Sequence, residues 1–288
     1  MEPKKLEALA TIIAASVLLR NLAKRSGEDL LAFAGARRSI ATAHGLFAAA
    51  MVALGAMELP ARAAELPVDL ELVLAVDASP SIGIPEFFLQ RRGYVAAFRN
   101  PQLVKAIRFG HYGRIAVTYV EWAGPTSQRI VIPWTLIDSA ESSAGFASLL
   151  ETARSYSRLG TSISGALAYA YQLFGNNGFA GERLVIDVSG NGPNAVGPSV
   201  VAVRDAVVAG GVTINGLPLI LTPDTAALGD YYRHCVIGGL GAFVVPVERS
   251  GDFAAAIRNK LVTEVAAGSK EEAAPVLRVS AVDKSCDG

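Results

Sequence analysis

The stretch that decides the fold is Leu70–Val76 (LELVLAV) followed directly by Asp77–Ser81 (DASPS). The first seven residues have the length and the Val/Leu content of a strand that is buried on both faces. A carboxylate at the end of such a strand, with hydroxyls two and four residues later, places three oxygen donors on one turn at the rim of a sheet. Mg²⁺ and Mn²⁺ prefer oxygen ligands, so this turn is a candidate cation site. The alternative is an ordinary strand end, because Asp, Ser and Pro all favour turns.

The composition fits one large domain and gives no sign of a nucleic-acid ligand. The 288 residues are 51% hydrophobic and 18% charged, with 26 basic and 26 acidic side chains and zero formal net charge. A chain of this size can bury a sizeable core. The two cysteines, Cys235 and Cys286, have no metal-ligand spacing. They can pair in an oxidising compartment, or Cys286 can stay unpaired in its polar surroundings.

Residues 1–63 are predicted to be a leader that contains a signal peptide. The apolar run Gly45–Met57 is too short to span a bilayer but has the length of a signal-peptide core. Arg37-Arg38 precedes this run, and Ala61-Arg62-Ala63 follows it as a small-x-small cleavage signal. We therefore expect a mature chain that starts near Ala64, has no stable membrane span and is periplasmic or secreted in a bacterium. An uncleaved membrane anchor or a buried helix is the alternative for the apolar run.

Strand and helix patterns alternate over residues 64–266. The Gly124-Pro125 connection between two of the strands leaves no room for a crossover helix, so these two are expected to form an antiparallel hairpin. The order predicts an α/β fold, with a doubly wound, mostly parallel sheet and one antiparallel edge strand, in a single domain. Residues 267–288 form a polar C-terminal tail. The expected strands are Leu70–Val76, Arg114–Trp122, Gln128–Trp134, Arg183–Ser189, Thr213–Ile220 and Ala242–Val247, and the expected helices are Pro85–Asn100, Ser142–Arg154, Ser162–Phe174, Pro198–Ala209, Asp224–Cys235 and Asp252–Val265.

Three loops should meet outside the carboxyl ends of the strands, where the strand order reverses. The first loop carries Asp77, Ser79 and Ser81, the second carries Thr161, and the third carries Asn191 in the sequence Ser-Gly-Asn-Gly. Hydroxyls and a carboxylate from separate loops suit a six-coordinate Mg²⁺ whose remaining positions hold water.

These residues and their order resemble the von Willebrand factor A domain and its metal-ion-dependent adhesion site. The resemblance extends from about Val68 to Ala266. Within it the chain is most similar to a bacterial exported family of unknown function, family 1194. That likeness rests on four phrases, Val120–Gly124 (VEWAG), Ile186–Gly190 (IDVSG), Ile214–Pro218 (INGLP) and Val236–Gly239 (VIGG).

The resemblance implies a division of roles among the rim residues. Ser79 and Ser81 would bind Mg²⁺ or Mn²⁺ directly, Thr161 directly or through water, and Asp77 through water. The open coordination position would accept an acidic side chain of a protein partner. Asn191 stands where the family pattern usually has Asp, and an amide oxygen brings no charge, so the site would hold metal more weakly.

Asp187 is the alternative to Asn191 as the residue that the third loop contributes. Strand alternation points Asp187 into the packing of the sheet, so Asn191 is the preferred assignment. Asp187 is then expected to be a buried carboxylate with local hydrogen-bond donors, such as Arg183 or Ser189.

The predicted function is an exported adhesion or scaffolding module that is not an enzyme and binds no nucleic acid. A metal-free module of the same fold, which binds by surface shape alone, is the main alternative. A nucleotide site would use the Gly190-Asn191-Gly192 turn, but the third glycine and a Walker-type lysine are missing. A hydrolase would need His111 or His234 beside a serine, and the sequence has no G-x-S-x-G motif. We expect His111 on a surface turn and His234 partly buried.

Overall fold

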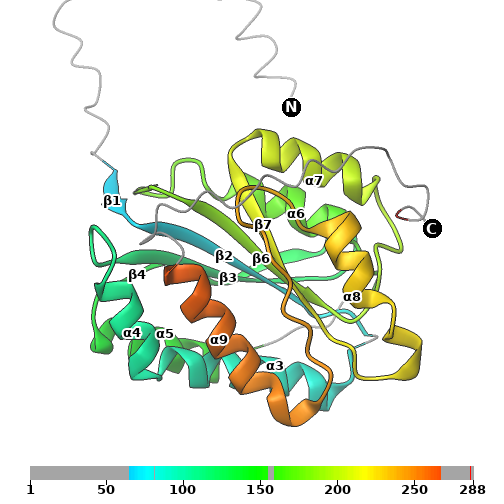
Figure 1. Ribbon diagram of the computed structural model, residues 1–288, viewed down its shortest axis with the longest axis horizontal. Helices are drawn as coiled ribbons and strands as arrows, with labels where there is room; N and C mark the ends of the chain where they lie inside the picture. The colour runs from blue at the N-terminus through cyan, green and yellow to red at the C-terminus, as the bar shows by residue number, and fades with distance from the viewer. Residues whose placement is uncertain (1–64, 81, 155–158, 267–285, 287–288) are drawn as a thin grey trace, which may run out of the picture. The chain divides into compact units, whose positions relative to one another are not determined.

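A computed structural model describes residues 65–80, 82–154, 159–266 and 286. Its centre is a five-stranded sheet with the strand order β4-β3-β2-β6-β7 (Figure 1). The strands are β2 (Leu70–Asp77), β3 (Ile115–Trp122), β4 (Gln128–Ile137), β6 (Leu184–Gly190) and β7 (Val212–Pro218).

The strands have the directions that the sequence predicts, with one antiparallel strand at the edge of a mostly parallel sheet. Strands β2, β3, β6 and β7 run parallel, and β4 pairs antiparallel with β3 at the edge. All eight residues of β2 are buried, which explains its nearly unbroken apolar run. The chain passes from β2 to β3 on one side and later returns to β6 on the other side. The strand order therefore reverses at β2, and its carboxyl end is the expected place for a ligand.

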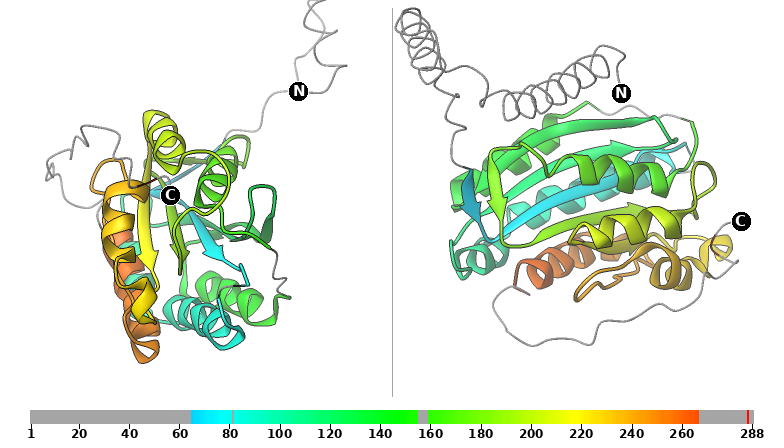
Figure 2. Two further views of the ribbon diagram at one scale, coloured as in Figure 1. Left: turned by 90° about the vertical axis from the view of Figure 1, so that its right-hand side faces the viewer. Right: turned by 90° about the horizontal axis from the view of Figure 1, so that it is seen from above.

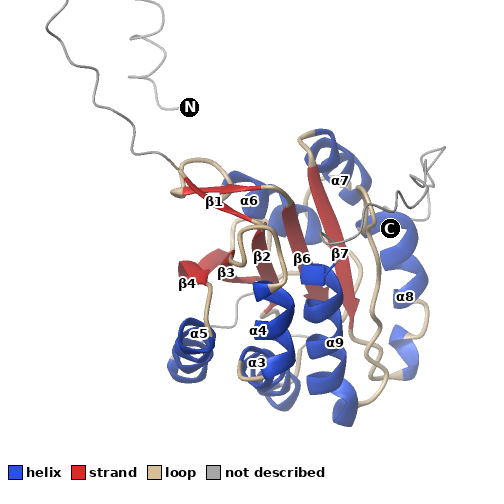
Figure 3. Ribbon diagram, turned by 60° about the vertical axis from the view of Figure 1, so that its left-hand side comes forward, coloured by secondary structure: helices blue, strands red, loops and turns tan. Residues whose placement is uncertain are grey.

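Helices cover both faces of this sheet. Alternate residues of β2 point into the two helical layers, since Leu72 packs in one hydrophobic cluster and Val73 in the other. Figure 2 shows α6 and α7 side by side across one face, and Figure 3 shows the helices of the other face together. One layer contains α3 (Ile84–Phe98), α4 (Pro101–Arg108), α5 (Ala140–Thr152) and α9 (Phe253–Ala266), and the other contains α6 (Ile163–Gln172), α7 (Val200–Ala209) and the short α8 (Leu228–Tyr231).

Helix α4 and a small second sheet do not appear among the elements expected from the sequence. Helix α4 begins after Asn100, whose side chain accepts a hydrogen bond from the backbone N–H of Gln102, and Pro101 is in its first turn. Both are ordinary helix-start signals, but the helix has only eight residues and follows α3 almost directly. The second sheet pairs β1 (Leu66–Val68) with β5 (Phe179–Gly181).

The structure differs from the sequence-based prediction in two elements near the C-terminal end. The segment Ala242–Val247 is not a strand, because it makes only isolated bridges beside β7, at Val244 and Val247. The expected helix Asp224–Cys235 is broken into a 3-10 turn at Pro223–Thr225, helix α8 and a π-helical turn at Tyr232–Val236. Tertiary packing decides such short segments, and periodicity alone does not resolve them.

A buried charge cluster joins β6 to α9. Lys260 Nζ contacts Asp187 Oδ1 and lies 3.5 Å from Glu264 Oε2, and all three side chains are 1% exposed. Asn215 Nδ2 donates to Glu264 Oε1 at 2.6 Å. Burial raises the pKa of Asp187 to about 7, although the nearby Lys260 acts in the opposite direction. Asp187 is thus buried as expected, but its partner is Lys260 rather than Arg183 or Ser189.

A disulfide between Cys235 and Cys286 ties the tail to the π-helical turn. The cysteines therefore pair, which is one of the two outcomes that the sequence left open. The predicted leader over residues 1–63 and the rest of the tail lie outside the described residues. Within the described ranges, none of the helices is both long and apolar enough to cross a membrane.

Candidate functional site

The first rim loop begins at Asp77, the last residue of β2. The backbone N–H of Ser79 donates to Asp77 Oδ1 at 2.7 Å, which closes a tight turn around the carboxylate. Asp77 is fully buried and Ser79 is 2% exposed, so this turn is packed against the end of the sheet. Ser81, the third expected ligand of this loop, lies outside the described residues.

The second carboxylate oxygen of Asp77, Oδ2, differs from Oδ1 in its hydrogen bonding. Asp77 Oδ2 is buried and has no hydrogen-bond partner among the described residues. Burial raises the pKa of Asp77 to about 6, while hydrogen bonds from Ser79 and from the backbone of Asn191 act to lower it. A buried acceptor without a donor is costly. A cation or an ordered water at Oδ2 would remove that cost.

Gly190, at the end of β6, brings the third loop directly against Asp77. A Cβ atom on Gly190 would lie 3.0 Å from Asp77 Oδ2, 3.0 Å from Tyr232 Oη and 3.2 Å from Trp122 Cζ2. Tyr232 Oη and Trp122 Nε1 are also buried without a hydrogen-bond partner in the described part of the chain. Burial, followed by the nearby charge of Asp77, raises the pKa of Tyr232. Asp77 Oδ2, Tyr232 Oη and the edge of the Trp122 ring therefore converge from three elements beside Gly190.

Asn191 follows Gly190 and approaches Asp77 through its backbone, whose hydrogen bond helps to hold the pKa of the carboxylate down. The Asn191 side chain is neither fully buried nor fully exposed. Asp187, the alternative third-loop residue, is instead held inside the domain by Lys260. Asn191 therefore lies at the rim of the sheet, whereas Asp187 lies in the core.

The second loop joins the third through the backbone of Thr161. Its carbonyl oxygen accepts hydrogen bonds from the N–H groups of Ala195, at 2.9 Å, and Val196, at 3.2 Å. The preceding Gly160 has a φ of 93°, and a Cβ there would lie 3.0 Å from the Cα of Gly124. Thr161 is partly buried. These backbone contacts bring the second loop, the third loop and the end of β3 to the same edge of the sheet.

The donors at this edge are one carboxylate, two hydroxyls and an amide, from Asp77, Ser79, Thr161 and Asn191. Within the described ranges no group of three His, Cys, Asp or Glu side chains could hold a metal ion. A metal here would therefore depend on hydroxyl and amide oxygens around a single carboxylate. Such a donor set suits a hard cation that keeps several waters, and the unpartnered Oδ2 of Asp77 is consistent with it.

Two residues that contribute to this edge, Trp122 and Tyr232, are not among the expected ligands. Their aromatic rings are those of ordinary core residues, so the sequence gives no reason to assign them to the rim. Only the fold brings Tyr232 Oη and the Trp122 ring to the space beside Gly190 that the Asp77 carboxylate also borders.

In the described part of the chain, the two histidines that a hydrolase would need make contacts of another kind. His111 is exposed, as expected, and its Nδ1 lies 2.9 Å from Glu182 Oε1, near the amino end of β3. His234 is exposed rather than partly buried, and its Nδ1 lies 2.8 Å from the carbonyl oxygen of Asp230. These two contacts pair neither histidine with a serine hydroxyl.

The glycine turn at Gly190–Gly192 does not open a helix. The next helix, α7, begins only at Val200, and its N-cap is Ser199. A phosphate-binding turn places its glycines directly at a helix start, so this geometry does not favour the nucleotide-site alternative.

Comparison with known proteins agrees with the fold. Residues 67–269 match a family model described as a protein of unknown function, DUF1194. No curated protein matches the chain.

Three solved structures illustrate the structural likeness. A von Willebrand factor type A protein from Catenulispora acidiphila is 15% identical, covering 69% of this chain and 43% of that chain, with a TM-score of 0.45. Proximal thread matrix protein 1 from the mussel byssus, solved with a zinc-occupied MIDAS motif, is 12% identical over 70% and 49%, with a TM-score of 0.49. The pilus adhesin SpaC from Lactobacillus rhamnosus GG is 10% identical over 70% and 30%, with a TM-score of 0.50.

The matched region therefore spans less than half of each of these three proteins. At such identities the likeness concerns the fold alone. The expected von Willebrand A-like fold is confirmed.

Proposed function

Since the chain belongs to the DUF1194 family of proteins of unknown function, we propose a function from its rim site: it is an exported protein-binding module that uses a divalent cation. The cation would be held at the carboxyl end of the sheet by Asp77, Ser79, Ser81, Thr161 and Asn191. Its role is to bind an acidic side chain of a partner protein. The proposal concerns adhesion or scaffolding and includes no catalytic step.

The observation that carries this proposal is the state of the Asp77 carboxylate. Its Oδ1 is used by the N–H of Ser79, while Oδ2 is buried without a protein donor in the described residues. An oxygen of this kind at a topological switch point is where a ligand is expected. A cation or a cation-bound water would also stabilise the charged form of a carboxylate whose pKa burial has raised.

Each rim residue has a role that follows from its chemistry. Asp77 provides the only negative charge of the proposed donor set, and Ser79 and Thr161 provide neutral hydroxyl oxygens. Asn191 provides an amide oxygen without charge. A bound Mg²⁺ or Mn²⁺ would act as a Lewis acid with a position open to a carboxylate. The donor set carries one negative charge and the cation carries two positive charges. The occupied site would therefore keep a net positive charge that attracts an acidic side chain of the partner.

The disulfide supports the proposed export. Cys235 and Cys286 are bonded although 51 residues separate them in the sequence. Such bonds persist in oxidising compartments such as the bacterial periplasm and the extracellular space. A periplasmic or secreted location agrees with this bond.

The direct test uses the peptide acetyl-Asp-Gly-Asn-amide, which carries one carboxylate. Binding to the purified full-length chain is measured by calorimetry in excess Mg²⁺ and again in EDTA. We expect binding only with Mg²⁺, and at the same Mg²⁺ concentration weaker binding to Asp77→Asn, because that variant holds the cation less tightly. Equal binding in EDTA would contradict a cation-bridged mechanism and would favour the metal-free module.

That metal-free alternative has one specific observation in its favour. Asn191 removes a negative charge from the position where the resembling family usually has Asp. If the cation does not bind, the same rim would have to recognise its partner by shape and hydrogen bonds. The EDTA arm of the experiment distinguishes the two mechanisms.

A further inference from the structure

Tyr232 reaches the rim of the sheet from the π-helical turn at Tyr232–Val236, and its side chain is fully buried. Its ring packs on β7 at Gly216, since a Cβ atom there would lie 2.7 Å from Tyr232 Cδ1. Its hydroxyl ends on the neighbouring strand β6, where a Cβ on Gly190 would lie 3.0 Å from Tyr232 Oη. Two glycines on adjacent strands therefore leave the room in which this side chain lies.

The turn that carries Tyr232 is held by several contacts. Arg204 Nη1 donates to the carbonyl oxygen of Ile237 at 3.3 Å, and the N–H of Ile237 donates to the carbonyl oxygen of Tyr232 at 3.0 Å. Within the turn, Cys235 forms the disulfide with Cys286. These contacts fix the backbone of the turn, and the position of the Tyr232 hydroxyl follows from it.

The Tyr232 hydroxyl and Asp77 Oδ2 border the same small space. Each of these oxygens lies 3.0 Å from the position that a Cβ on Gly190 would take. Both are buried, and neither has a hydrogen-bond partner among the described residues, so they are not bonded to each other. A buried acceptor and a buried hydroxyl without partners both cost free energy.

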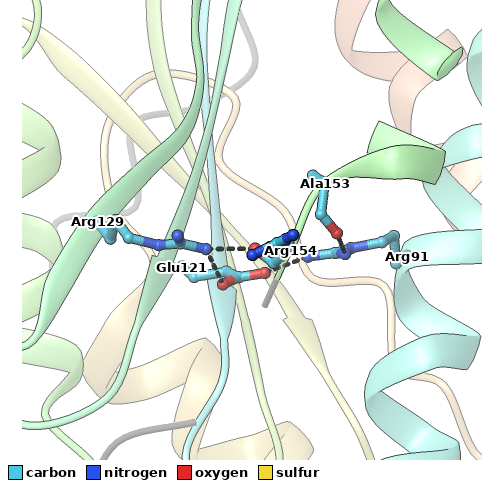
Figure 4. Close-up of polar contacts among 5 residues, drawn as sticks. All are labelled: Arg91, Glu121, Arg129, Ala153 and Arg154. Carbon is cyan, nitrogen blue, oxygen red and sulfur yellow. Dashed lines mark hydrogen bonds and ion pairs between the residues drawn. The ribbon is translucent and has the colours of Figure 1, made fainter. Parts of the chain in front are cut away.

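The other buried carboxylate near this edge, that of Glu121, has protein partners on both oxygens. Its Oε1 lies 2.5 Å from Arg91 Nη2, and its Oε2 lies 3.2 Å from Arg129 Nη2 (Figure 4). Asp77 Oδ2 has no such partner in the part of the chain that the structure describes. A group that is still needed at Asp77 Oδ2 is therefore small and comes from outside the described protein atoms.

A single water molecule has the size and the chemistry for this place. A water at roughly 2.8 Å from each of two oxygens bridges a separation of up to roughly 5.6 Å, which suits two oxygens that border one Cβ position. Buried waters satisfy polar groups of this kind. The Trp122 ring borders the same space, and its Nε1 is also buried without a partner among the described residues.

We propose that Tyr232 and Asp77 Oδ2 hold one ordered water molecule between them, and that Tyr232 thereby positions the Asp77 carboxylate for the cation. The inference rests on the proposed function and adds a positioning residue to its site. The Tyr232 hydroxyl donates to the water, and the water donates to Asp77 Oδ2, while the N–H of Ser79 holds Oδ1. Each carboxylate oxygen accepts more than one hydrogen bond, so Oδ2 can still serve the cation site.

The test compares Tyr232→Phe, which removes only the hydroxyl, with the matched control Tyr119→Phe. Tyr119 is also fully buried, but its ring packs in the hydrophobic layer on the opposite face of the sheet. The Mg²⁺ affinity of each full-length chain is measured by calorimetry. Urea denaturation in EDTA then gives the effect of each substitution on the free energy of unfolding, in the native chain and in Asp77→Asn.

We expect Tyr232→Phe to bind Mg²⁺ about ten-fold more weakly, as for the loss of one hydrogen bond to a charged group. Tyr119→Phe should leave the Mg²⁺ affinity unchanged. In EDTA, Tyr232→Phe should change the free energy of unfolding by different amounts in the native chain and in Asp77→Asn, because the charge at the other end of the water is missing in the second. Tyr119→Phe should have the same effect in both backgrounds.

If the native chain binds Mg²⁺ and Tyr232→Phe binds it equally well, the inference is overturned and the proposed function stands. If the native chain does not bind Mg²⁺, the proposed function fails and the urea experiment alone decides the inference. Unequal effects of Tyr232→Phe in the two backgrounds would then support the shared water. Equal effects in the two backgrounds would overturn the inference in either case.

Discussion

The backbone N–H of Ser79 donates to Asp77 Oδ1 at 2.7 Å, while Asp77 Oδ2 stays buried without a hydrogen-bond partner in the described part of the chain. One oxygen thus fixes the orientation of the carboxylate, and the other remains available for a ligand. This arrangement separates the structural task of Asp77 from its proposed task in cation binding. It also implies that the second task can be removed without the first, because an amide oxygen at the Oδ1 position can still accept from Ser79.

Gly190→Ala should disturb both the site and the fold. A Cβ at this position would meet Asp77, Tyr232 and Trp122 at 3.0–3.2 Å, and all three are buried with little room to move. We expect a loss of about 1–3 kcal/mol in the free energy of unfolding, measured by urea denaturation, together with weaker Mg²⁺ binding. Gly192→Ala is the matched control, since a Cβ there meets nothing within 4 Å. Equal effects at the two positions would mean that crowding at Asp77 is not the cause.

Asn191→Asp should tighten Mg²⁺ binding. The substitution adds a negative charge to a donor set that otherwise has only that of Asp77, so we expect a gain of about ten-fold in affinity by calorimetry. Asn194→Asp serves as the control, because it adds the same charge three residues along the same loop. No change in Asn191→Asp would place the side chain of Asn191 outside the reach of the cation.

The buried Asp187 should make the unfolding free energy depend on pH. Its pKa is raised from the usual value near 3.8 to about 7, so between these values the folded chain holds a proton that the unfolded chain has lost. The stabilisation from this group is complete below about pH 4 and is lost as the pH rises through about 7. Lys260, Glu264 and Tyr94 are the titratable groups around it.

The measurement compares urea denaturation of the native chain and Asp187→Asn at pH 5, 6, 7 and 8. The native chain should lose more stability over this range than the variant, because an asparagine cannot titrate. Parallel pH profiles for the two proteins would show that Asp187 does not hold its proton as the buried site requires.

Cys286→Ser should destabilise the domain by about 2–4 kcal/mol, because the disulfide closes a loop of 51 residues in the unfolded chain. Cys235→Ser should cost a similar amount, and the double variant should cost no more than either single one, since all three lose the same bond. Thermal unfolding with and without a reductant measures these effects. Additive losses in the double variant would indicate separate roles for the two thiols.

The sheet and its rim were predictable from the sequence because they depend on strong local signals. The run Leu70–Val76 is buried on both faces and therefore apolar at nearly every position. The Gly124-Pro125 turn forces β3 and β4 into an antiparallel pair. Asp77, Thr161 and Asn191 then follow from the rule that ligands bind at the carboxyl ends of the strands. That these residues hold a cation stays a prediction.

Other features depend on contacts between distant segments, which local patterns do not contain. The pairing of Asp187 with Lys260 joins residues that are far apart in the sequence, so Arg183 and Ser189 were the nearest candidates and were wrong. The segment Ala242–Val247 has the composition of a strand, but only isolated bridges beside β7 form there. The contact between Glu121 on β3 and Arg91 on α3 also joins distant segments, and no local sequence pattern predicts it.

The central claim is tested most directly by titrating Mg²⁺ into the purified full-length chain in a calorimeter, beside Asp77→Asn and Ser79→Ala. Asp77→Asn keeps the acceptor for the Ser79 N–H and removes the buried charge, so the variant should stay folded. We predict saturable Mg²⁺ binding to the native chain, and a loss of at least about ten-fold in affinity in both variants. Absence of binding at millimolar Mg²⁺, or unchanged affinity in both variants, would contradict a cation site at this rim.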